Sequence, residues 1–136
     1  MRRQCMLVLA LVAGGGLIGC HRNPTGPQNG PLTPGRWTMD SGVCLSVTDT
    51  TCNLVVGCGH GQFPPPIVRA DGTFDVDGTY RIEAGPISID PAPPAHFSGS
   101  VTGSHLILNV TPSASLPPAS YSMAPTSAGT CPVPCL

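Results

Sequence analysis

The chain has 136 residues, of which six are basic and seven are acidic, and none is a lysine. The formal net charge of −1 and the scattering of the charges exclude the concentrated basic surface of a nucleic-acid-binding protein. Seventeen glycines and seventeen prolines, with apolar residues at alternating spacing, favour short strands and many turns over helices.

The first nineteen residues have the features of an export signal. Arg2 and Arg3 precede an uncharged apolar run from Cys5 to Ile18, and a run of about fourteen residues is too short for a permanent membrane-spanning helix. The run ends in Leu17-Ile18-Gly19-Cys20, which resembles the lipobox of bacterial lipoproteins. The resemblance implies that residues 1–19 are removed and that Cys20 becomes the lipidated first residue.

We therefore expect a protein of the cell envelope, attached to a membrane through lipid on Cys20, because two or three acyl chains bind a bilayer far more firmly than one. By resemblance to the sorting of such lipoproteins, His21 favours the outer membrane if the cell has one. Residues 20–35 are rich in proline and glycine and predict a flexible stalk. Residues 36–136 remain as a single domain with a proline-rich C-terminal tail.

Turn chemistry predicts the hairpins of this domain. Gly103-Ser104 is typical of a two-residue type II′ turn between two alternating strands. The predicted register pairs Val101 with Leu106, Gly99 with Leu108 and Phe97 with Val110. All of these apolar partners then share one face of the sheet.

Two further hairpins follow from the same reasoning. A three-residue loop with Gly72 in the left-handed region pairs its flanking residues and keeps one face apolar. The predicted pairs are Arg69 with Thr73 and Val68 with Phe74. Residues 43–47 pair with residues 52–56, with Leu45, Val47, Leu54 and Val56 inward, and Tyr80 and Ile82 point inward from another strand.

Hairpins that follow one another at a spacing of roughly eight to twelve residues predict an all-β fold built as a small antiparallel meander. The favoured architecture is a partly open up-and-down, lipocalin-like barrel. The alternative is a compact β-sandwich.

Four segments occur in an order that is similar to an uncharacterised family of small exported bacterial β-rich lipoproteins. They are Gly35-Arg36-Trp37, Cys58-Gly59-His60-Gly61, the run from Asp71 to Tyr80 and the hairpin from Phe97 to Val110. The similarity extends over roughly residues 35 to 111. The family has no established activity that the resemblance could imply for this chain.

Five cysteines follow Cys20, in a compartment that permits disulfides. Members of the family usually end in a cysteine, so the resemblance implies a bridge between Cys58 and Cys135. A second bridge would join Cys131 to Cys52 or Cys44, and the odd count leaves one cysteine unpaired. Each bridge would contribute on the order of 3 kcal/mol to stability.

A zinc site is the rival interpretation, with Cys58 and His60 as ligands and Cys52 or His105 completing the set. The paired Cys-x2-Cys spacing of structural zinc sites is missing, so structural disulfides are favoured, with no metal and no cofactor. His60, between two glycines, is expected in a turn, and His96 and His105 are expected to face solvent.

Asp71, Asp75 and Asp77 precede Gly78, but they fail the register of a calcium-binding loop. Acidic turn residues between strands explain them without a metal.

No nucleophile elbow, metalloprotease motif or phosphate loop occurs in the sequence, so we expect no enzyme. The favoured function is a non-catalytic, lipid-anchored envelope protein that acts as a binding or interaction module for a protein or a small-molecule ligand. A ligand would lie in the mouth of the barrel near Trp37, Tyr80 and Phe97, unless these aromatic side chains only fill the core. The alternative is a metal-dependent or thiol enzyme that uses the segment around Cys58 and His60.

Overall fold

The computed structural model describes residues 29–39, 42–83, 91–113, 115–127, 129–132 and 135. All regular elements in these ranges are strands. They are β1 (Gly30–Pro31), β2 (Gly35–Met39), β3 (Val43–Val47), β4 (Cys52–Val56), β5 (Gly59–Phe63), β6 (Ile67–Val68), β7 (Thr73–Ile82), β8 (Pro94–Thr102), β9 (His105–Pro112) and β10 (Ala119–Thr126).

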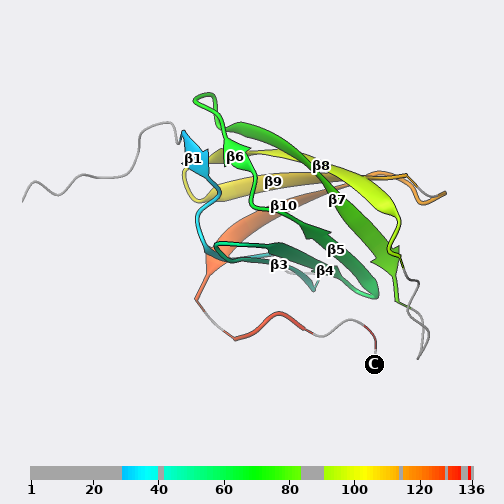
Figure 1. The fold of residues 1–136 in the computed structure, drawn as a ribbon. Helices are drawn as coiled ribbons and strands as arrows, with labels where there is room; N and C mark the ends of the chain where they lie inside the picture. The colour runs from blue at the N-terminus through cyan, green and yellow to red at the C-terminus, as the bar shows by residue number, and fades with distance from the viewer. Residues whose placement is uncertain are drawn as a thin grey trace, which may run out of the picture.

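Eight of the strands form a closed antiparallel barrel in the order β10-β2-β3-β4-β5-β7-β8-β9, and β1 pairs with β6 in a separate small sheet (Figure 1). Each barrel strand lies beside the barrel strands that precede and follow it in the chain, so the barrel is of the up-and-down type. The all-β barrel is therefore confirmed. It is closed, however, and not partly open as expected.

The strand that closes the barrel is β10, which pairs with β9 on one side and with β2 on the other. It lies in the segment that the sequence indicated as a proline-rich tail. Small and apolar side chains alternate along it, with Ala119, Tyr121 and Met123 opposite the inward-facing residues of β9. Pro125 is accommodated near the end of the strand, opposite Trp37 of β2.

Two of the predicted hairpins are present in the predicted register. In β8 and β9, Val101 lies opposite Leu106 and Phe97 lies opposite Val110. Gly103 has a φ of 58°, and the following residue is not in the left-handed region, as a type II′ turn requires. In β3 and β4, all four residues that were expected to face inward do so, and Leu45 lies opposite Leu54.

The third hairpin is only partly as predicted. Gly72 has a φ of 83°, and the amide of Arg69 donates to the carbonyl of Thr73 at 2.9 Å. Val68 was expected opposite Phe74, but it pairs instead with Gly30 of β1. Three consecutive prolines, residues 64–66, end β5 and have no amide hydrogen to continue a ladder, so the chain leaves the barrel before β7 begins.

This excursion forms a plug at one end of the barrel. Leu32, next to β1, is 2% exposed, and Val68 of β6 is 1% exposed; both belong to the core cluster. The amide of Leu32 donates to the carbonyl of Pro66 at 2.9 Å, which fixes the two segments together. Gly30 and Leu32, which belong to the segment expected to be a stalk, thus take part in the described fold.

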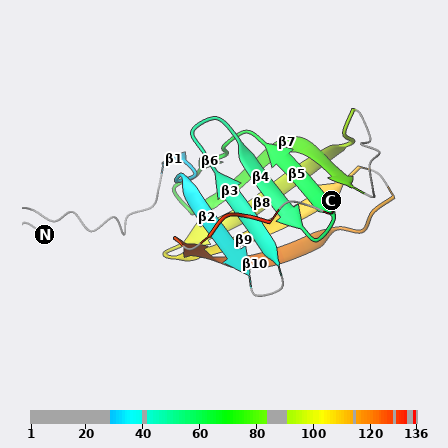
Figure 2. The same ribbon diagram turned by 90° about the horizontal axis from the view of Figure 1, so that it is seen from below.

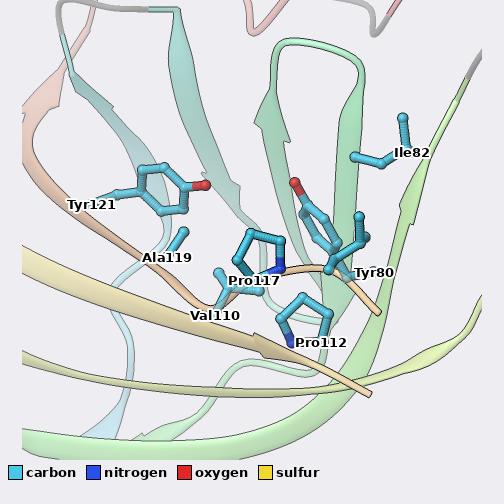
Figure 3. Close-up of a pocket in the computed structure, with 8 residues that line it drawn as sticks. Tyr80, Ile82, Val110, Pro112, Pro117, Ala119 and Tyr121 are labelled. Atoms are coloured by element: carbon cyan, nitrogen blue, oxygen red, sulfur yellow. The ribbon is translucent and has the colours of Figure 1, made fainter. Parts of the chain in front are cut away.

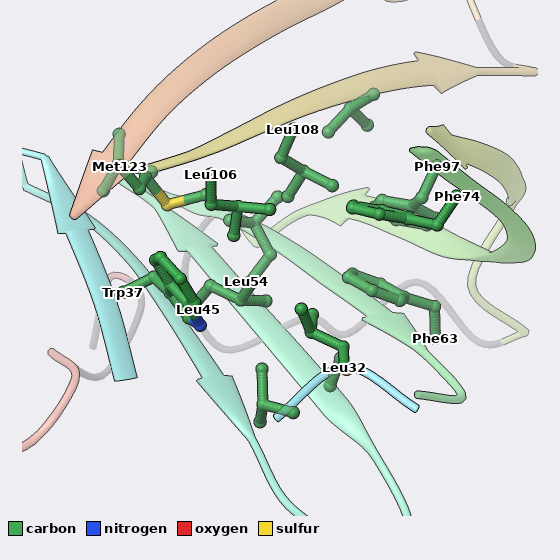
Figure 4. Packing of buried hydrophobic residues seen from close by; sticks show 14 of the residues in the cluster. Leu32, Trp37, Leu45, Leu54, Phe63, Phe74, Phe97, Leu106, Leu108 and Met123 are labelled. Atoms are coloured by element: carbon green, nitrogen blue, oxygen red, sulfur yellow. The ribbon is translucent and has the colours of Figure 1, made fainter. Parts of the chain in front are cut away.

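The interior of the barrel is filled by aromatic and aliphatic side chains (Figure 4). The rings of Phe63 and Phe97 stack with centroids 4.2 Å apart. A Cβ on Gly61 would lie 3.1 Å from the ring of Phe97, and a Cβ on Gly99 would lie 2.9 Å from the ring of Phe74. The missing side chains on these strands make room for the rings, so this barrel has a packed core where larger barrels have a cavity.

The C-terminal segment crosses the outer face of β3 and β4 (Figure 2). It is held there by disulfides from Cys44 to Cys131 and from Cys58 to Cys135, with Cα–Cα distances of 5.6 and 5.0 Å. The second pair is the one that the family resemblance implied, and the first is one of the two alternatives left open. Among the cysteines that the structure describes, Cys52 is the free one, because its side chain points into the barrel.

We expect the replacement of Cys44 and Cys131 by serine to lower the free energy of unfolding by about 3 to 5 kcal/mol, because the bridge closes a loop between residues 87 positions apart. Urea unfolding followed by circular dichroism measures the change. Replacement of the unpaired Cys52 by alanine is the control for a lost cysteine without a lost bridge. A change below about 1 kcal/mol in the double variant would contradict the role of the bridge.

Candidate functional site

The structure opens a pocket of about 210 Å³ at the end of the barrel opposite the plug (Figure 3). The plug lies where β7 begins and β8 ends, whereas the pocket lies where β7 and β9 end and β10 begins. Its walls are mainly apolar. The lining residues are Tyr80, Ile82, Val110, Pro112, Leu116, Pro117, Ala119 and Tyr121.

The alternation of β-strands aims these side chains into the pocket. Residues two apart on a strand share a face, so Tyr80 and Ile82 of β7 point the same way, as do Ala119 and Tyr121 of β10. Ala119 lies opposite Val110 of β9, which brings the two strands to one wall. Closure of the barrel by β10 is therefore what forms the pocket.

Two phenol groups are the polar features of the pocket. In Figure 3 the hydroxyl groups of Tyr80 and Tyr121 point toward each other across the opening. Burial raises the pKa of Tyr80, and the nearby phenol of Tyr121 raises it further; burial also raises the pKa of Tyr121. Both groups are thus protonated at neutral pH and can donate a hydrogen bond.

The Tyr80 hydroxyl is seated against the backbone of β5. A Cβ on Gly59 would lie 2.0 Å from this oxygen, so only glycine leaves space for the phenol at that position. Neither tyrosine hydroxyl has a hydrogen-bond partner among the described residues. Every fully buried side-chain oxygen or nitrogen in the described ranges has a hydrogen-bond partner. Because the two tyrosine hydroxyls have none, neither is fully buried, and both are accessible from the pocket.

The three aromatic residues singled out from the sequence have different positions. Tyr80 lines the pocket. Phe97 is fully buried in the middle of the barrel, stacked on Phe63. Trp37 is buried beside Leu45 and Met123, nearer the plug (Figure 4).

Sequence reasoning missed most of the pocket, including Tyr121. The signal that could have found it is the period-two alternation of Ala119, Tyr121 and Met123, which matches a strand with one buried face. The prolines around this segment hid the signal, because they indicated a tail.

The segment from Cys58 to His60 lies in the wall of the barrel, where Gly59 backs the pocket residue Tyr80. Cys58 is in a disulfide, and His60 lies within β5, not in a turn as expected, opposite Val55 and Arg81. Its Nδ1 is 3.8 Å from Glu83, whose carboxylate accepts a hydrogen bond from Arg81 at 2.8 Å. No group of three metal-ligating side chains occurs among the described residues.

The aspartates form local pairs on the outer surface. Asp71 accepts hydrogen bonds from the amide and hydroxyl of Thr73, as a turn residue does. Asp75 and Asp77 lie within β7, not in a turn as expected; Asp75 pairs with Arg69, and Asp77 lies 2.8 Å from His96. Each of the three carboxylates therefore has a protein partner.

His105 and His96 are exposed, as the sequence indicated. Nε2 of His105 lies 2.8 Å from the hydroxyl of Ser122 on the outer face of β10.

The expected lipidation site, Cys20, lies outside the described residues. No helix in the described ranges is long and apolar enough to span a membrane.

Cys52 provides a test of the core. The side chain is fully buried, and burial raises the pKa of its thiol to about 12, so the reactive thiolate is scarce at neutral pH. We expect iodoacetamide at pH 8 to leave Cys52 unmodified in the native domain. In denaturant without reductant, it should add one carbamidomethyl group per chain, on Cys52. Intact mass would also show four hydrogens fewer than the fully reduced chain, for two disulfides. Rapid labelling of the native protein would contradict the buried position.

No family model, curated protein or solved structure matches this chain.

Proposed function

We propose that the protein is a non-catalytic, lipid-anchored module of the cell envelope that binds a small molecule in the mouth of its barrel. The observation that supports this most strongly is the pocket of about 210 Å³ in a barrel that is otherwise filled with side chains and plugged at its other end. An apolar pocket with a few convergent polar groups is typical of ligand sites.

The composition of the pocket favours binding over catalysis. Among the residues that the structure describes, its lining contains no carboxylate, histidine, cysteine or serine side chain that could act as a base or a nucleophile. The two phenols are protonated at neutral pH, as ordinary tyrosines are, and burial raises their pKa values further. The enzyme alternative built on Cys58 and His60 lacks support, because Cys58 is bonded to Cys135.

The position of β1 supports a pocket that faces away from the membrane. The chain reaches the domain at β1, which belongs to the plugged end. Eight residues lie between Cys20 and Asn29, the first described residue, and a chain of this length spans at most about 30 Å. A lipid on Cys20 would then hold the plugged end toward the bilayer and leave the mouth open to the aqueous side.

The anchor is tested by replacing Cys20 with serine in the full precursor. We expect the variant to lose incorporation of radiolabelled palmitate and to shift from the membrane fraction to the soluble fraction, because serine offers no thiol for alkylation. Cys5→Ser, which alters the other cysteine of the expected signal, is the matched control and should keep both properties. Palmitate incorporation into the Cys20→Ser protein would contradict the proposal.

The ligand site is tested by filling the pocket. We expect Ala119→Leu to weaken binding of ethylbenzene by about tenfold or more, because the added carbons occupy space that the probe needs. Chemical shifts of Val110 and Ile82 methyl groups report the binding in an NMR titration. Ser120→Ala, on the outer face of the same strand, is the control and should bind as the parent does. Equal affinities for the parent and Ala119→Leu would place the probe elsewhere and contradict the site.

A further inference from the structure

The pocket combines apolar walls with two hydrogen-bond donors that have no partner in the described part of the protein. The phenols of Tyr80 and Tyr121 come from β7 and β10 and point toward each other (Figure 3). A carbonyl oxygen has two lone pairs and can accept one hydrogen bond from each of two donors. The arrangement therefore suits a ligand with an uncharged oxygen acceptor near these hydroxyls.

The described lining residues carry no charge and therefore select against ionic ligands. None of those that the structure describes is Asp, Glu, Lys, Arg or His. A carboxylate or an ammonium group in the pocket would lose its hydration without gaining an opposite charge, and that transfer is costly. A neutral polar group loses less hydration and is compensated by the phenols.

The size of the pocket restricts the hydrocarbon part of the ligand. A dry cavity of roughly 150 Å³ holds one benzene molecule. The pocket here has about 210 Å³, which leaves room for one ring and a short substituent. The filled layer of Phe63 and Phe97 closes the barrel behind it, so a long acyl chain cannot extend into the interior.

We propose that the ligand of this site is a neutral molecule with a single ring or a body of similar size, bearing a carbonyl oxygen that accepts hydrogen bonds from Tyr80 and Tyr121. This inference rests on the proposed function and specifies the chemical class that the pocket takes.

Three probes of nearly the same shape separate the contributions. Acetophenone has the ring and the carbonyl oxygen, ethylbenzene has the ring alone, and benzoate has the ring and a negative charge. Their affinities for the disulfide-intact domain are measured by the same NMR titration, followed on the methyl groups of Ile82 and Val110. Tyr80→Phe and Tyr121→Phe each remove one hydroxyl and keep the ring, and Ser120→Ala is the outer-face control. Thermal unfolding verifies that each variant is folded.

We expect acetophenone to bind about three- to tenfold more tightly than ethylbenzene, as one or two net hydrogen bonds allow, and benzoate to bind more weakly than either. The two Tyr→Phe variants should reduce the preference for acetophenone and leave ethylbenzene binding unchanged. Loss of that preference in both variants but not in Ser120→Ala would support the role of the phenols.

Other outcomes overturn the inference in distinguishable ways. Equal binding of acetophenone and ethylbenzene, unchanged in the Tyr→Phe variants, would leave the ligand site in place and refute the carbonyl contact. Tightest binding of benzoate would also leave the site and refute the neutral class. If none of the three probes shifts the pocket resonances up to its solubility limit, the proposed ligand site itself fails.

Discussion

The pairing of β10 with both β9 and β2 is the interaction on which the rest of the structure depends. Without it, β9 and β2 would each expose an unpaired edge, and the apolar faces of the sheet would be open to water. The bridges from Cys131 and Cys135 hold the chain that follows β10 against the outside of β3 and β4. The side chain of Arg36 in β2 also donates to the carbonyl of Ser127, just beyond β10, at 2.9 Å. The last strand is thus fastened by the segment that comes after it.

The disulfides act on the outer face of the wall, where a small barrel has little other stabilisation. Cys44 and Val55 point outward, yet they are 4% and 6% exposed, which fits their position under the C-terminal segment. A domain of about a hundred residues buries a modest fraction of its surface, so cross-links between distant parts of the chain contribute substantially to its stability. Reduction of the bridges would loosen the wall and the pocket together, because β10 carries Ala119 and Tyr121.

The packing inside the barrel explains why the pocket is small and lies at one end. Gly61 and Gly99 face the rings of Phe97 and Phe74. Because glycine has no side chain, the rings occupy this space and fill the middle of the barrel. The prolines after β5 send the chain out to form the plug at the other end. In the part of the chain that the structure describes, open space is left at the mouth, where Tyr80 and Tyr121 border the filled core.

The sequence by itself determined the all-β class, the up-and-down order and the registers of β3 with β4 and of β8 with β9, because turn residues and period-two alternation are local properties of the chain. It also indicated Tyr80 as an inward aromatic residue. Only the tertiary structure decided the closing strand, the plug and the partner of Tyr80 in the pocket. These features depend on contacts between segments far apart in the chain, such as Pro125 opposite Trp37 and Val68 opposite Gly30. Prolines at residues 64–66 and 117–118 mark a change of direction locally, but which strand the chain joins next depends on which apolar face is still uncovered.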